Sequence, residues 1–142
     1  AINDRQVLLH DMDHFWVLPG GGVESVESSI DALKREFKEE LGIEVNIKRL
    51  IWVIENFFEY NGQKEKSTEF YYLIEFPLNP EIYNKANFEG FEKGANLKLN
   101  FKWQSLEEID DLTIVPECLP GLLKELINTD KADIKHIVHK SI

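Results

Sequence analysis

Residues 18–45 read LPGGGVESVESSIDALKREFKEELGIEV, a glycine-rich turn followed by a pattern typical of a helix. From Ser28 or Ser29 to about Leu41, apolar residues recur at spacings of three and four, which predicts an amphipathic helix. The apolar positions are Ile30, Leu33, Phe37 and Leu41. Either serine can cap the start of the helix, and Gly42 is well placed just beyond its end. The stretch therefore predicts a loop, a helix and a second loop.

The same helix carries three acidic residues, Glu36, Glu39 and Glu40, at positions i, i+3 and i+4. This spacing places the three carboxylates on one face of the helix. Like charges so arranged cost roughly 0.2–0.5 kcal/mol per pair, and a bound cation would offset that cost. Hard oxygen ligands suit Mg²⁺ or Mn²⁺, and no cysteine or histidine is near for zinc or copper. The simpler interpretation of the acids is an ordinary solvated helix face.

Composition limits the classes of protein that the chain can belong to. Its 142 residues are 43 % hydrophobic and 30 % charged, which excludes a disordered or low-complexity chain and fits one domain over residues 1–142. The net charge of −10 disfavours DNA and anionic membranes as partners. No apolar stretch is long enough to span a membrane, no signal-peptide pattern is found, and the single Cys118 favours the cytoplasm.

Short apolar runs on both sides of the helix predict β-hairpins. Gln6–His10 and Phe15–Leu18 form one candidate pair, and Leu50–Tyr60 with Thr68–Phe76 form another. The second pair is joined through Asn61-Gly62, a type I′ turn signal. The remaining predictions are an irregular loop over 84–96, a strand over Leu97–Trp103, a helix over Glu117–Asn128, and either a short strand or a frayed tail over 134–142. This order predicts an α+β domain with a mixed sheet covered by helices.

The stretch quoted first resembles the Nudix box, the signature of the Nudix (MutT-like) hydrolases. All seven fixed positions of that box are present: Gly21, Glu27, Arg35, Glu36, Glu39, Glu40 and Gly42. At a background usage of about 7 % per residue type, seven chance matches would occur on the order of once in 10⁸ start positions. The signal is therefore specific, unlike a lone glycine motif.

The resemblance implies an α/β/α sandwich with a mixed β-sheet, in which the loop–helix–loop is the catalytic element and holds divalent metal. Carried over by position, Glu36, Glu39 and Glu40 are metal ligands, and the carbonyl of Gly20 is a further candidate. Arg35 resembles the residue that fixes a box glutamate through a charge-assisted hydrogen bond. The implied reaction is attack by a metal-activated water on a pyrophosphate, with Glu39 or Glu36 taking the proton.

The resemblance implies a Mg²⁺-dependent hydrolase, with Mn²⁺ as the other candidate ion, acting on a small nucleotide-type substrate. Nucleoside triphosphates, ADP-ribose, nucleotide sugars, dinucleoside polyphosphates and capped RNA all stay open, although the negative charge disfavours long RNA. The alternative is a non-catalytic Nudix-fold module that binds a nucleotide or a protein, and the intact set of carboxylates favours the enzyme. Family members similar to this chain are often homodimers, which leaves its own oligomeric state open.

Three positions depart from the family pattern. Phe37 stands where an aliphatic residue is usual, so a repacked core is expected. Val26 stands where a glycine commonly precedes the loop glutamate, so the local turn is expected to differ. Lys102 occupies a position where several members have an additional glutamate. Either Glu89 or Glu92 supplies that function, or the box glutamates act without it.

Several other side chains are interpreted as structural. Strand aromatics belong more often to a core than to a base-stacking site, and this interpretation covers Trp16, Trp52, Phe57, Phe58, Tyr60 and Trp103. Glu55, Glu59 and Glu69 lie on or near the central hairpin, where the alternative to the expected surface position is a place in the substrate cleft. For Lys64, Lys66 and Lys102 the alternative to the expected solvation is contact with phosphates. The spacing of metal ligands is not found among His10, His14, His136 and His139. Cys118 is expected to be a small, buried apolar residue.

Overall fold

The computed structural model describes residues 1–92, 94, 96–129 and 132–142, and it places helix α1 over Ser29–Leu41. Ser28 is the N-cap, since its side chain accepts a hydrogen bond of 3.0 Å from the backbone N–H of Asp31. Gly42 follows the helix in the left-handed conformation, with φ of 68°. Both helix ends are therefore confirmed, and the choice between two capping serines is decided.

Both predicted hairpins are present. Strands β4 (Asn46–Tyr60) and β5 (Gln63–Glu75) are antiparallel and longer than predicted. The two residues of their turn have positive φ angles, 51° at Asn61 and 77° at Gly62, as a type I′ turn requires. In the first hairpin, β2 (Gln6–Asp11) pairs with a shorter β3 (Trp16–Val17).

The strands form two sheets. The larger sheet has the order β1 (Ile2–Asn3), β2, β7 (Leu97–Ser105) and β6 (Asn87–Glu92), with β3 also paired to β2. The smaller sheet has the order β5, β4 and β8 (Lys135–Lys140), and β8 runs parallel to β4. The smaller sheet is therefore the mixed one, and the ambiguous segment near the C-terminus is a strand.

The prediction of an irregular loop over 84–96 is wrong, because β6 lies within it and pairs with β7 along its whole length. The reason is Gly90, which interrupts the apolar alternation. A Cβ at Gly90 would lie 2.6 Å from the backbone oxygen of Glu40 and 3.0 Å from the ring of Phe101. Glycine therefore allows β6 to pass close to α1, and the same glycine hides the strand pattern.

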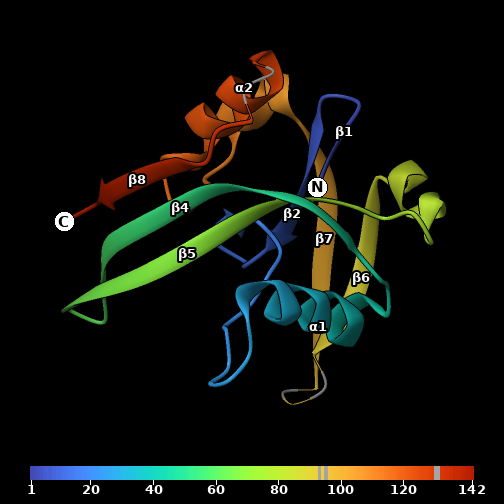
Figure 1. Cartoon of the computed structure of the whole chain (residues 1–142), viewed down its shortest axis with the longest axis horizontal. Helices are drawn as coiled ribbons and strands as arrows, with labels where there is room; N and C mark the ends of the chain where they lie inside the picture. Colours follow the sequence, from blue (N-terminus) through green and yellow to red (C-terminus); the bar gives the residue numbers. More distant parts are fainter. Residues whose placement is uncertain (93, 95, 130–131) are drawn as a thin grey trace.

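Two helices cover the sheets from opposite sides, with α1 below and α2 (Leu119–Asn128) above in Figure 1. Helix α2 begins at Leu119, after the predicted Glu117. Two short 3₁₀ helices complete the connections, η1 (Pro80–Asn84) and η2 (Leu106–Asp111). The expected α/β/α arrangement is confirmed.

Each helix packs on its own apolar cluster, and alternate side chains of β2 contribute to both clusters. Leu9 is buried with the α2 cluster, whereas its neighbour Leu8 is buried with the α1 cluster. Phe37 is 2 % exposed, and its ring centroid lies 5.7 Å from that of Phe76, so this departure from the family pattern is accommodated in the core. Ile30, predicted to belong to the apolar stripe, is instead exposed.

Within the described ranges, the helices are too short or too polar to cross a lipid bilayer.

Candidate active site

Arg35 connects the glycine-rich loop to the acidic face of α1. Its Nε and Nη2 donate to both carboxylate oxygens of Glu27, at 3.2 and 2.8 Å, and Nη2 also donates to the carbonyl of Gly22 at 3.0 Å. Its Nη1 donates to Glu36 at 3.0 Å and to Glu39 at 3.3 Å. The hydrogen bond with Glu27 raises the pKa of Arg35 and lowers that of Glu27, so both stay charged. A single guanidinium therefore fixes the loop against the helix.

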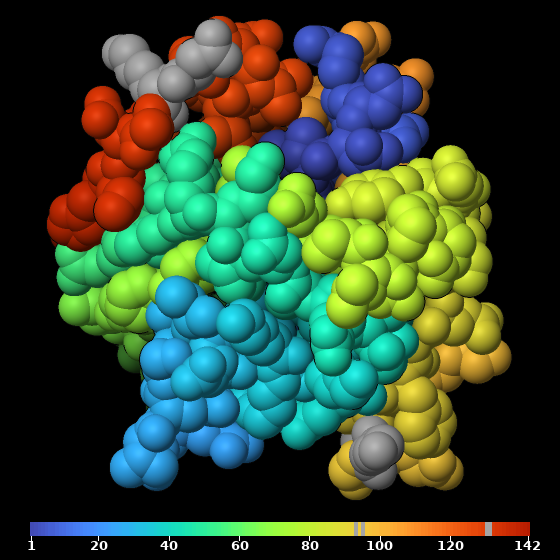
Figure 2. Space-filling model, turned by 45° about the vertical axis from the view of Figure 1, so that its right-hand side comes forward, coloured from blue at the N-terminus to red at the C-terminus, as the bar shows by residue number. Residues whose placement is uncertain are grey.

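The loop in front of α1 folds around this arginine. The carboxylate of Glu27 accepts a further hydrogen bond of 2.9 Å from the backbone N–H of Glu24. Between these two residues, Val26 is fully exposed with a φ of 68°. Val26 thus has a left-handed backbone, a conformation that favours glycine and costs a residue with a side chain roughly 1–2 kcal/mol. Figure 2 shows this loop, in lighter blue, projecting at the lower left of the molecule.

Glu36, Glu39 and Glu40, hereafter the helix acids, lie together as the helical spacing predicts. Burial, and then a hydrogen bond with Glu36, raise the pKa of Glu40 to about 7, and the charges of Glu36, Glu92 and Glu39 add to the effect. The backbone of the loop lies directly against the pair, since a Cβ at Gly21 would be 2.3 Å from Cδ of Glu36. Up to about neutral pH the protonated form of Glu40 is therefore favoured, and a cation bound among the helix acids would displace that proton.

In metal-free buffer, the Tm is expected to fall as the pH rises from about 4.5 through about 7, because folding holds a proton on Glu40 in this range. A raised pKa contributes stability below the unfolded value and loses it above the folded value. Since Glu40 is only half buried, solvent screening limits the change to a few degrees. Thermal melts in EDTA at a series of pH values measure it. In Glu40→Gln the side chain at position 40 does not titrate. If the Tm of this variant fell with pH in parallel with that of the wild type, the pH dependence could not be assigned to Glu40.

Among the described acids outside the helix, Glu92 carries a charge that raises the pKa of Glu40. The carboxylate of Glu89 is instead paired with Lys98 at 3.5 Å. Lys102 is only partly exposed, and its ammonium lies 4.3 Å from the ring centroid of Trp16. The lysine at the position of the family's additional glutamate therefore makes a cation–π contact and is not simply solvated.

The helix acids supply hard oxygen donors, which fit Mg²⁺ or Mn²⁺. In the described part of the chain, no three acidic, histidine or cysteine side chains converge as metal ligands. Arg35 instead binds Glu36 and Glu39 through hydrogen bonds, and burial favours the protonated form of Glu40. Gly20 lies at the start of the loop, and a Cβ at this position would lie 3.9 Å from the side chain of Leu33.

Two adjoining cavities lie beside the loop. The first, the loop cavity, has a volume of about 520 Å³ and is lined by Gly20–Gly22, the start of α1 and part of β5. The second, the hairpin cavity, has a volume of about 630 Å³ and lies between β3, the β4–β5 hairpin and residues 115–117. The two cavities have four lining residues in common: Leu18, Ser67, Glu69 and Tyr71.

Glu69 lies in the wall of both cavities, so its assignment to the surface is wrong. Its Oε2 accepts hydrogen bonds from Asn56 Nδ2 at 3.1 Å and from Ser67 Oγ at 2.5 Å, and its Oε1 accepts one from Tyr71 at 2.5 Å. Asn56 is itself buried. No signal in the strand pattern distinguishes Glu69 from a solvent-facing glutamate, because the cavity forms only where β5 meets residues distant in the sequence, among them Val17 and residues 115–117.

The other candidates have structural partners. Trp52 and Trp103 are buried in the core as predicted, whereas Phe58 and Tyr60 line the hairpin cavity. Three histidines pack or pair as follows: His10 on Phe101, His136 with Glu55, and His139 with Glu117. Cys118 is partly buried, and burial raises the pKa of its thiol, so it is not an activated nucleophile.

Comparisons with known proteins identify the same family that the box resembles. The NUDIX domain family matches residues 2–124 of the chain. An RNA pyrophosphohydrolase of Bartonella clarridgeiae is 32 % identical over 123 residues, a match that covers 73 % of this chain and 64 % of that protein. An RNA pyrophosphohydrolase of Campylobacter jejuni subsp. doylei is 33 % identical over 75 residues, covering 45 % of this chain and 46 % of that protein. The chain thus spans less than two thirds of the length of these relatives.

Two solved structures support the fold. The mutator MutT protein from Bacillus halodurans aligns with a TM-score of 0.57 at 21 % identity, covering 99 % of this chain and 86 % of that one. The E. coli ORF135 protein aligns with a TM-score of 0.52 at 24 % identity, covering 92 % and 88 %. With the complete box on the loop and helix α1, the arginine that fixes the loop and a family match over residues 2–124, the chain belongs to the NUDIX domain family.

Proposed function

We propose that residues 1–142 act as one divalent-metal-dependent hydrolase of the pyrophosphate bond in nucleoside diphosphate-linked or nucleoside triphosphate substrates. The observation that carries the proposal is the complete box, in which Arg35 is hydrogen-bonded both to the loop, at Gly22 and Glu27, and to Glu36 and Glu39 of α1. Family membership and relatives named RNA pyrophosphohydrolase support the same reaction. The chain retains every box carboxylate, which disfavours the alternative of a non-catalytic binding module.

The helix acids, with the carbonyl of Gly20 as a further candidate, would hold Mg²⁺, or Mn²⁺ in its place. When bound, such an ion lowers the pKa of water and neutralises phosphate charge. Arg35 keeps the loop and the acids in position through its hydrogen bonds. Glu39 is 54 % exposed and has a single bond to Arg35 at 3.3 Å, so it is the carboxylate best placed to accept the proton of an attacking water.

The substrate is proposed to be a small nucleotide. The net charge of −10 repels a long polyanion, so RNA, the substrate class named for the relatives, is expected to enter only through its terminal phosphates. A cytoplasmic location is part of the proposal, because a lone thiol such as Cys118 stays reduced there.

Phosphate and pyrophosphate release from a panel of nucleotides and a short 5′-triphosphorylated RNA tests the proposal. Turnover is expected with Mg²⁺ or Mn²⁺, and removal of metal by EDTA is expected to abolish it. Retention of the rate in EDTA would contradict metal dependence. Absence of turnover across the panel, from folded protein that binds Mg²⁺, would favour the binding module.

A further inference from the structure

The hairpin cavity has one wall of hydrogen-bond acceptors. Glu69 receives the hydroxyl protons of Ser67 and Tyr71, so the lone pairs of these hydroxyls stay available. Burial, together with the bond to Glu69, raises the pKa of Tyr71, so its phenol remains protonated and continues to donate to the carboxylate. The amide of Asn56 is oriented by donation from Nδ2 to Glu69, which leaves its Oδ1 as an acceptor and the second N–H of Nδ2 as a donor. The side chains lining this wall therefore accept more hydrogen bonds than they donate.

The remaining lining of the cavity is apolar or negatively charged, apart from the hydroxyl of Ser141, which donates to the carbonyl of Phe57. Its apolar side includes the rings of Phe15, Phe58 and Tyr60, which suit the face of a flat ligand. Carboxylates of Glu59 and Glu117 also line the cavity, so a phosphate group would be repelled from it. A volume of about 630 Å³ is in the range of small-ligand sites.

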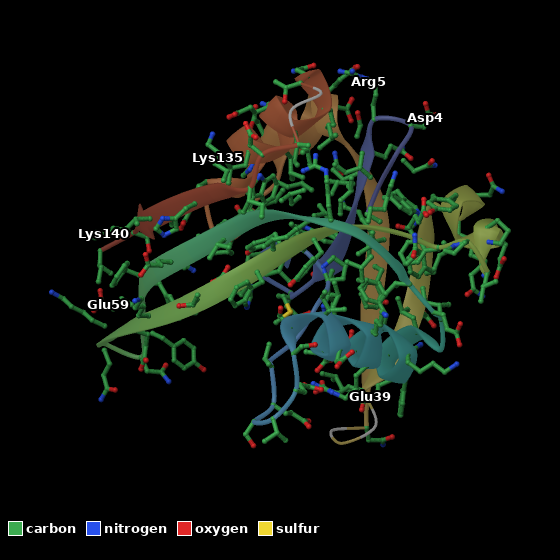
Figure 3. The ribbon with its side chains drawn as sticks, in the orientation of Figure 1. Asp4, Arg5, Glu39, Glu59, Lys135 and Lys140 are labelled. Carbon is green, nitrogen blue, oxygen red and sulfur yellow. The ribbon has the colours of Figure 1, made fainter. Side chains whose placement is uncertain are left out.

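The hairpin cavity is connected to the region of the helix acids through the loop cavity. It adjoins the loop cavity, which leads past Leu18 to the glycines in front of α1. In Figure 3, Glu59 lies near the far end of the β4–β5 hairpin, well separated from Glu39 on the lower side of α1. The backbone of Gly21, in the wall of the loop cavity, lies against the carboxylate of Glu36, so a nucleotide with its phosphates at the helix acids would extend its base through the loop cavity toward the hairpin.

We propose that the hairpin cavity binds the base of the substrate and selects guanine. Guanine presents adjacent N1–H and N2–H₂ donors, the complement of a wall of acceptors. Adenine and cytosine present an amino group next to a ring acceptor, and uracil presents one N–H between two carbonyls. The inference rests on the proposed function, because hydrolysis at the helix acids brings a nucleotide to this cavity.

The test is kcat/KM for GTP, ATP, CTP and UTP at saturating Mg²⁺. The wild type is expected to favour GTP by about tenfold or more. Glu69→Gln exposes an amide that cannot accept as two carboxylate oxygens do, so its kcat/KM for GTP is expected to fall by about tenfold and the preference to disappear. Glu75→Gln is the matched control, since Glu75 accepts a bond of 2.7 Å from Asn46 on the same two strands, outside the cavity. It is expected to keep the preference.

Equal kcat/KM values for all four nucleotides with the wild type, or an unchanged preference in folded Glu69→Gln, would overturn the proposal. Binding of guanosine and adenosine to the wild-type protein, followed by NMR, depends neither on catalysis nor on the folding of a variant. Guanosine bound at least about tenfold more tightly, with no nucleotide hydrolysed, would support the base site while the proposed hydrolase fails. Metal-dependent hydrolysis without preferential binding of guanosine would leave the hydrolase standing and overturn guanine selection.

Discussion

Glu39→Gln is expected to lower kcat by roughly 10²- to 10⁴-fold, the usual contribution of a general base. Its carboxylate is 54 % exposed and bonds to Arg35 alone, so the variant should fold normally. Steady-state kinetics at saturating Mg²⁺, with thermal melts alongside, measure both effects. Glu44→Gln, an exposed glutamate just beyond the helix, is the matched control and is expected to retain wild-type rates.

Comparison with Glu36→Gln separates the two carboxylates that the sequence leaves open as the base. The carboxylate of Glu36 is 17 % exposed, bonded to Arg35 at 3.0 Å and covered by the backbone of Gly21. Its loss is therefore expected to weaken Mg²⁺ binding, with kcat partly recovered at high Mg²⁺. If Glu36→Gln stays inactive at saturating metal while Glu39→Gln works at the wild-type rate, the assignment of the base is reversed.

Arg35→Lys is expected to lower kcat/KM by about 10²-fold, even though the positive charge is kept. A lysine ammonium cannot replace the guanidinium fork that binds both oxygens of Glu27, the carbonyl of Gly22 and the acids of α1. The loop is then no longer fixed against the helix, and the reacting groups lose their alignment. Kinetics over a range of Mg²⁺ concentrations measure the loss.

Arg5→Lys provides the matched control, because Arg5 makes an exposed pair with Glu107 at 3.3 Å. That exchange is expected to leave activity unchanged. Should Arg35→Lys also keep its activity within about twofold of the wild type, charge alone would explain the role of Arg35, and the geometric argument for the fork would fail.

Local features of the sequence predicted the catalytic element well. The helix, its cap at Ser28 and its end at Gly42 depend on neighbouring residues, and the shared face of the acids follows from helical spacing. The shorter strands were harder to predict from the sequence. In β6, for example, Gly90 interrupts the alternation of apolar and polar residues. Strand β8 reads KHIVHK, with only two apolar residues, and therefore looked equally like a tail.

Contacts between distant segments could not be read from the sequence. The charge of Glu92 reaches Glu40 because β6 passes beside α1, a close approach that no local pattern encodes. Glu69 faces a cavity because β3 and residues 115–117 line the same space as β5. In each case tertiary packing, and not the preference of a residue for strand or surface, determines the environment of the carboxylate.

The parallel pairing of β8 with β4 also affects how the protein folds during its synthesis. Residues 52–57 of β4 pair with residues 135–140 of β8, which are synthesised much later. One edge of β4 therefore stays without its partner until residues 135–140 have left the ribosome. Such long-range closure is slow, and an open strand edge invites pairing with other chains in the meantime. Nascent chains stalled before β8 are therefore expected to bind chaperones and to be cut by proteases at β4, whereas released chains resist both.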